Sequence, residues 1–335
     1  MPYVFGGSSG GGGQLPTISF FGSQTWTPSY DITAKVFVIG GGGSGGISAG
    51  AANKACGGGA AGCAVSELTF ASGTTYTITI GAGGASSATQ NAMAAGNAGG
   101  ASSLSGSGIS TMTANGGSAG SGVAAGTGAC IATGGSASGG TLGNFTGGSS
   151  GDCSANVYNS VSGGGAVGLW ANGNHAPVGT GSAHGGKMGA CINWDHDTFS
   201  SSDHFNSTHG SGGNTTSFGG VPTMSPFPNL AVDEREYLGA SYMGSGGESR
   251  RATREQKAGQ GTHYYHYIHT ASTNYYGIAG PLNGGCGAGP HTTVAVAGRG
   301  SLGGGGGGVA TGNNTYAYSG PGGDGGVLIF PSSIG

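Results

Sequence analysis

The sequence contains very little charge. Only 9 Lys and Arg and 12 Asp and Glu occur among 335 residues, and the formal net charge is −3. Charged residues make up 6% of the chain, against about 25% in average soluble domains. Proteins that bind nucleic acid normally carry a basic surface. The composition therefore argues against nucleic acid as a partner.

Long hydrophobic runs are also missing. No stretch of 18 apolar residues suggests a membrane span, and the opening MPYVFGGSSGGGG lacks the basic and apolar regions of a signal peptide. We therefore expect synthesis in the cytoplasm without membrane insertion. Because no secretion signal is seen, we expect most of the cysteines to be small buried thiols. The alternative is that the protein ends outside a cell and its thiols oxidise there. The six are Cys56, Cys63, Cys130, Cys153, Cys191 and Cys286.

Glycine is the abundant residue, at 83 positions. Each glycine in regular structure costs about 0.5–1 kcal/mol relative to alanine, which an ordinary packed core does not easily offset. Collagen is excluded because glycine has no period of three and proline numbers only 11. The 13 Tyr, 11 Phe and 3 Trp argue against a chain that is disordered throughout. The composition favours glycines placed where backbones approach closely and bond to one another.

Four segments have the β-branched and aromatic pattern of strands, at residues 34–39, 65–70, 75–80 and 327–330. In the third, TYTITI, we expect the Tyr and Ile side chains on one face and the Thr side chains on the other. If the last segment pairs with the first or the third, the two ends of the chain close one sheet. The sequence thus predicts a small β-sheet frame that the C-terminal strand closes.

Gly, Ser and Ala tracts fill residues 81–190 and show no apolar period. They therefore predict neither amphipathic helices nor ordinary strands. Polyglycine-II helices, which lack internal hydrogen bonds, are the ordered form expected when such tracts pack side by side. A disordered linker is the alternative. The predicted fold class is mainly β and irregular, with packed polyglycine-II-type segments and a long loop-rich insertion.

We expect one domain. The sequence predicts a flexible arm or attachment segment at residues 1–14. It predicts a single glycine-rich, adhesin-like domain at residues 15–335, with a variable insertion at about 118–300. Within the insertion, residues 233–257 hold ten of the 21 charges and form the one place where a short helix is plausible.

Aromatic side chains in and near the insertion are candidates for contact with a receptor, because rigid rings supply area at small entropic cost. The alternative is packing between glycine-rich layers or subunits. The candidates are Trp170, Trp194, Tyr264, Tyr265, Tyr267, Tyr275 and Tyr276.

Motifs for cofactors, metals and catalysis are weak. Gly40-x-Gly42-x-x-Gly45 lacks the helix that a dinucleotide site requires. His263, His266 and His269 could gather a metal at a threefold axis, but surface hydrogen bonding explains them more simply. Asp195 or Asp197 with Asp203 is weak support for a glycosidase. We expect no cofactor, no resident metal and no enzymatic activity.

Several motifs stand in an order that resembles the glycine-rich domain of bacteriophage tail fibres and receptor-binding adhesins. An opening Phe, Trp and Pro leads to a strand ending in polyglycine, then to a GTTYTITIGAGG-type strand and turn, and then to a closing GGDG motif. These are Phe21, Trp26 and Pro28, then residues 36–43, residues 73–84 and residues 322–329. The resemblance covers roughly residues 17–117 and 320–330, and none of its motifs lies in the insertion.

The resemblance implies a virion protein, made in the host cytoplasm, that binds a host surface molecule without catalysis. The expected partners are a host glycan or outer-membrane protein and other fibre or baseplate proteins, with a homotrimer as the expected assembly. A purely structural virion protein, such as a capsid or tail decoration or a fibre shaft, is the alternative. An ice-binding protein would need Thr or Ala at a fixed spacing, which we do not find.

Overall fold

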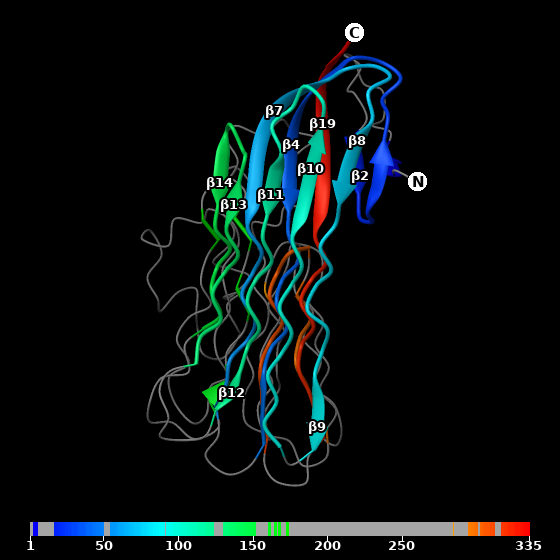
Figure 1. Cartoon of the computed structure of the whole chain (residues 1–335). Helices are drawn as coiled ribbons and strands as arrows, with labels where there is room; N and C mark the ends of the chain where they lie inside the picture. Colours follow the sequence, from blue (N-terminus) through cyan, green and yellow to red (C-terminus); the bar gives the residue numbers. More distant parts are fainter. Residues whose placement is uncertain are drawn as a thin grey trace, which may run out of the picture.

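The described part of the chain is an elongated β-protein (Figure 1). The computed structural model describes residues 3–5, 17–49, 54–90, 92–123, 130–151, 160–161, 164–165, 167–168, 172–173, 284, 294–300, 302–311 and 316–335. Every regular element in these ranges is a strand, as the sequence predicted for the fold class. None of the described residues belongs to a helix that is long and apolar enough to cross a membrane. The helix considered at residues 233–257 lies outside the described ranges.

Two sheets form a sandwich at the end of the molecule that carries both chain termini (Figure 1). The larger sheet has the order β1-β2-β19-β4-β7-β14, and all of its pairs are antiparallel. Its strands are β1 (Tyr3–Phe5), β2 (Thr17–Phe20), β19 (Gly326–Ile334), β4 (Ile32–Ile39), β7 (Cys63–Phe70) and β14 (Gly143–Phe145). The last strand of the chain therefore lies between β2 and β4.

The smaller sheet has the order β13-β11-β10-β8-β3. Its strands are β13 (Ala137–Ser138), β11 (Met112–Ala114), β10 (Ser102–Gly106), β8 (Tyr76–Thr79) and β3 (Gln24–Trp26). In β8, Tyr76 and Ile78 are buried while Thr77 and Thr79 are exposed, which confirms the predicted alternation. The strands predicted at residues 34–39, 65–70 and 327–330 are confirmed as parts of β4, β7 and β19, and the strand predicted at residues 75–80 is confirmed as the shorter β8.

The expectation that residues 81–190 contain no ordinary strand was wrong at β10 and β11. These strands form a hairpin that pairs with β8, and the turn between them contains Gly108 at a φ of 80°. A φ in this region favours glycine. Leu104 and Met112 are fully buried. The two strands were missed in the sequence because each contains only one large apolar residue, and their other residues are small.

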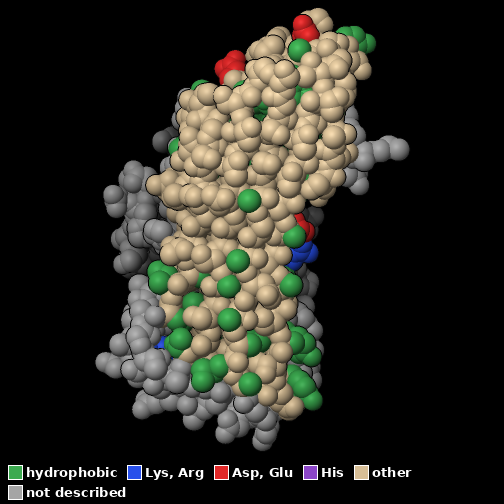
Figure 2. Space-filling view, viewed as in Figure 1, with side chains coloured by type: hydrophobic (Ala, Val, Ile, Leu, Met, Phe, Trp, Pro, Cys, Tyr) green, Lys and Arg blue, Asp and Glu red, His purple; other side chains and the backbone are tan. Residues whose placement is uncertain are grey.

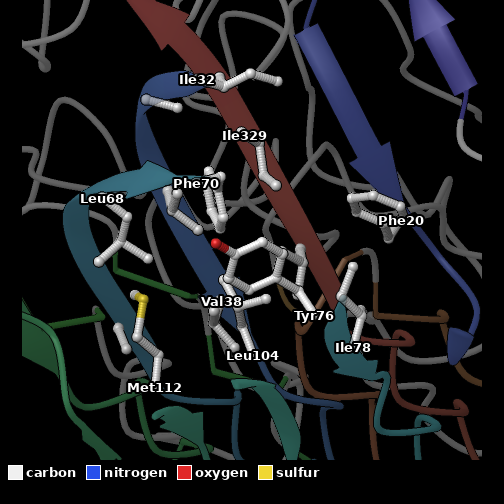
Figure 3. Close-up of a cluster of buried hydrophobic side chains, with 14 of the residues drawn as sticks. Phe20, Ile32, Val38, Leu68, Phe70, Tyr76, Ile78, Leu104, Met112 and Ile329 are labelled. Carbon is white, nitrogen blue, oxygen red and sulfur yellow. The ribbon is translucent and has the colours of Figure 1, made fainter. Parts of the chain in front are cut away.

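The main core fills the space between the two sheets (Figure 3). Phe70 lies at the centre of an aromatic group, with its ring centroid 5.0 Å from that of Trp26 and 4.9 Å from that of Tyr76, both edge-on. Edge-to-face pairs contribute about 0.5–1.5 kcal/mol beyond area burial. The Ala71 N–H donates to the Tyr76 hydroxyl at 2.9 Å. This core explains why Trp26 of the opening motif and Tyr76 of β8 occur together, whereas Phe21 of the same motif is 47% exposed.

Below the sandwich, the strands continue as extended glycine-rich segments that bond sideways to one another (Figure 1). Residues 40–46 continue from β4, and their N–H groups donate to three neighbouring segments in turn. Residues 40, 43 and 46 donate to carbonyls of residues 56–62, residues 41 and 44 to residues 97–100, and residues 42 and 45 to residues 320–323. The donor–acceptor distances range from 2.8 to 3.3 Å. Partners thus repeat every third residue.

This packing leaves no room for a side chain at many glycines. A Cβ on Gly43 would lie under 3.0 Å from the backbone of Ser118, and one on Gly59 would clash in the same way with Thr133. The obstructing atoms are backbone atoms, which cannot rotate away. The high glycine content therefore follows from the short distance between neighbouring segments of the chain. We call these packed segments the glycine bundle.

We expect Gly43→Ala to lower the free energy of unfolding by at least about 1–3 kcal/mol, because its Cβ must displace the backbone of Ser118. Gly22→Ala is the matched control, since nothing lies within 4 Å of a Cβ at that position. Its effect should stay within about 0.5 kcal/mol. Denaturant unfolding of both variants measures the difference, and equal stabilities would contradict the packing described here.

We expect Tyr76→Phe to lower the free energy of unfolding by about 0.5–1.5 kcal/mol, because the Ala71 N–H loses its acceptor while the ring stays buried. Tyr30→Phe serves as the control, since the Tyr30 side chain is 62% exposed. Thermal and denaturant unfolding curves of the two variants test the contribution of this hydroxyl. A Tyr76→Phe protein as stable as the control would show that it contributes nothing.

Candidate functional site

The end of the glycine bundle away from the chain termini is formed by short strands. We call it the distal end, and Figure 1 shows β9 and β12 there. One sheet has the order β16-β18-β9, a second pairs β17 with β5, and a third has the order β12-β6-β15. The bounds are β16 (Val294–Val296), β18 (Tyr316–Tyr318), β9 (Ala88–Gln90), β17 (Val309–Thr311), β5 (Ile47–Ala49), β12 (Gly122–Val123), β6 (Lys54–Ala55) and β15 (Ser160–Val161).

Two tyrosines stand on the outer face of β18. Tyr316 is 51% exposed and Tyr318 is 40% exposed, whereas Ala317 between them is fully buried. Alternate residues of a strand point to opposite faces, and residues two apart lie roughly 7 Å from each other along the strand. Both rings therefore project from the same face at a spacing suited to a ligand that spans them.

The strand beneath these rings is firmly anchored. Ala317 packs against Ile47, Ala297 and Val309 in a small hydrophobic cluster. The Ala297 N–H donates to the Tyr318 carbonyl at 3.0 Å, and the Ser319 N–H donates to the Ser87 carbonyl at 3.0 Å. The tyrosine rings are thus held on a preformed surface.

The two described strands that carry and flank the tyrosines, β18 and β9, contain no charged residue. Tyr316 lies opposite Gln90 and Tyr318 opposite Ala88 in the antiparallel register of β18 and β9, and both partners are exposed. In the view of Figure 2, many exposed hydrophobic side chains lie in the lower half of the molecule, over the glycine bundle. An amide, two phenol hydroxyls and two rings can bind a neutral polar ligand through hydrogen bonds and ring contacts.

The residues proposed from the sequence as receptor contacts all lie outside the described ranges. They are Trp170, Trp194, Tyr264, Tyr265, Tyr267, Tyr275 and Tyr276, and they stay predictions. The same holds for His263, His266 and His269. No group of three or more His, Cys, Asp or Glu side chains that could hold a metal gathers among the residues that the structure describes.

Sequence reasoning missed Tyr316 and Tyr318. The usable signal was the alternation in Tyr-Ala-Tyr, which is typical of a strand with one exposed face. The pattern is short and lies between glycine-rich runs, whereas the insertion contains many more aromatic residues. Only the pairing of β18 with β9 places the two tyrosines at the distal end.

The fold defines a class of glycine-rich scaffold in which a two-sheet sandwich continues into a bundle of laterally hydrogen-bonded segments. The chain belongs to the glycine-rich domain family, which matches residues 16–261. A comparison with curated proteins found no match.

We expect the double variant Tyr316→Ala, Tyr318→Ala to have a free energy of unfolding within about 1 kcal/mol of the native value, because both rings face solvent. Ala317→Asp should be clearly destabilising, because it places a charge in the apolar cluster beneath the strand. Thermal unfolding of the two variants compares how much the exposed and the buried face of β18 contribute to stability. Reversed effects would show that the exposed and buried faces are wrongly assigned.

Proposed function

We propose that this protein is a phage tail fibre or fibre-tip protein that binds a host cell-surface receptor non-covalently. The observation that carries the proposal is the separation of two ends: the first and last strands, β1 and β19, lie in the sandwich, and β9 lies at the other end (Figure 1), where it pairs with β18 and its two exposed tyrosines. The ordered frame motifs and membership of the glycine-rich domain family support it. An elongated body with attachment at one end and recognition at the other suits host attachment.

We infer that the glycine bundle consists of polyglycine-II helices, in which every third residue faces the same neighbour. The support is the period of three in the partners of residues 40–46. We also infer that β19 closes the frame, because this last strand pairs with both β2 and β4. Such a body has many backbone hydrogen bonds and few charges, so its stability depends little on salt.

We expect the receptor to be a glycan without net charge. The tyrosine rings offer flat apolar faces, and their hydroxyls and the Gln90 amide offer hydrogen bonds. A strongly anionic ligand would favour basic side chains, which β9 and β18 lack.

At the sandwich end, the expected partners are other fibre or baseplate proteins of the virion. The C-terminus is held there, since the Gly335 N–H donates to the Asp31 carbonyl at 2.9 Å. The homotrimer expected from the resemblance stays a prediction, and sedimentation equilibrium measures it directly.

The direct test uses the fluorescently labelled full chain on an array of bacterial surface glycans and on a panel of bacterial strains. We expect binding that Tyr316→Ala, Tyr318→Ala weakens about tenfold, because two ring contacts of about 0.5–1.5 kcal/mol each are lost. Tyr30→Ala is the control, since the Tyr30 side chain is also exposed, at 62%, but lies just before β4 at the sandwich end.

Folded native protein that binds neither glycans nor cells would overturn the proposed function. Native binding that the double variant retains in full would instead place the receptor contact elsewhere on the chain. The alternative, a purely structural virion protein, predicts regular copies along the particle by immunogold microscopy together with no binding to cells.

A further inference from the structure

Two thiols from distant parts of the chain meet inside the glycine bundle. Cys56 directly follows β6, and Cys130 begins the described segment 130–151. Both side chains are buried, they pack together with Val123, and both carry thiols. No part of the proposed receptor surface uses them.

The surroundings of Cys56 favour its thiolate. The Ser121 N–H donates to the Cys56 sulfur at 3.2 Å, and the Ser121 hydroxyl lies 3.6 Å from the same sulfur. A hydrogen bond with the Cys130 thiol has the largest effect, and together with the bonds from Ser121 and Ser150 it lowers the pKa of Cys56 to about 6, against the opposing effect of burial. The thiolate is the nucleophilic form of cysteine.

Hydrogen bonds fix the backbone at Cys56 and close to Cys130. The Cys56 N–H donates to the Ser121 carbonyl at 3.0 Å, and the Gly46 N–H donates to the Cys56 carbonyl at 2.9 Å. On the other side, the Ala132 N–H donates to the Ser150 hydroxyl at 2.8 Å. The two cysteines thus lie on or beside hydrogen-bonded segments, and their side chains pack together.

Cys63 is a useful contrast. It is fully buried in β7, its sulfur lies 3.9 Å from the Ala64 carbonyl, and burial raises its pKa. Its thiol therefore stays protonated at neutral pH, so Cys63 serves as an internal control.

We propose that Cys56 and Cys130 are an oxidative modification site, at which a peroxide-class oxidant converts the two thiols into an intramolecular disulfide. The Cys56 thiolate attacks one oxygen of hydrogen peroxide, the O–O bond breaks, and the product is a Cys56 sulfenic acid plus hydroxide, which takes up a proton to become water. The Cys130 sulfur then attacks the Cys56 sulfur. The S–S bond forms, the S–O bond breaks, and the Cys130 proton leaves with the hydroxyl as a second water.

The two cysteines together lose two electrons, and one peroxide becomes two waters. The new bond joins residue 56 to residue 130 and so restricts the unfolded chain over that whole loop, which stabilises the native state. A protein built on glycine, whose unfolded chain is unusually free, gains from such a restriction.

The test starts from the fully reduced full-length protein and adds one equivalent of hydrogen peroxide at pH 7. We expect an intact mass lower by two hydrogens and, in a non-reducing peptide map, one cross-linked pair that contains Cys56 and Cys130. The unfolding midpoint should rise by roughly 5–10 °C. Dithiothreitol should reverse both changes.

Cys130→Ser should stop the reaction at the Cys56 sulfenic acid, which dimedone traps, whereas Cys63→Ser should cross-link like the native protein. The peptide map of the native protein decides the question even if a variant fails to fold. The proposal is overturned if no Cys56–Cys130 peptide forms, or if Cys56 pairs instead with Cys63, Cys153, Cys191 or Cys286.

Discussion

The structure depends on lateral hydrogen bonding between backbones that approach too closely for side chains. Residues 40–46 show this most clearly, because successive N–H groups reach three different neighbouring segments and a Cβ at Gly43 would clash with the backbone of Ser118. Buried backbone groups must be paired, and here neighbouring segments pair them across the bundle. Glycine is costly in ordinary structure, but in this bundle it is the residue that lets the segments come together.

The sandwich gives the bundle its alignment. The glycine segment at residues 40–46 continues directly from β4, whose register with β7 and β19 is set by buried side chains on both faces of the sheet. Phe37 and Val38 on β4 belong to different hydrophobic clusters, so a slip of one residue would exchange the two faces. Packed side chains thus fix the register, and the glycine segments, which have few side chains to distinguish one alignment from another, extend it to the distal end.

Much of the strand frame was predictable, because apolar and polar residues alternate in the sequence wherever a strand has one buried face. Residues 75–80 are the clearest case, and Tyr76 and Ile78 enter the core as expected. The hairpin of β10 and β11 was missed, since Leu104 and Met112 mark it too sparsely among small residues. The candidate site was not predicted, because Tyr316 and Tyr318 are unremarkable until β18 pairs with β9.

The sequence by itself determined that this protein has a glycine-based, nearly uncharged body with a strand frame near both ends of the chain. Composition and short-range periodicity carry that information, since both follow from local rules of burial and backbone cost. Only the tertiary structure decided which segments are neighbours, that Tyr316 and Tyr318 share an exposed face, and that Cys56 meets Cys130. These are contacts between residues far apart in the chain, and glycine tracts that resemble one another do not encode which of them lie side by side.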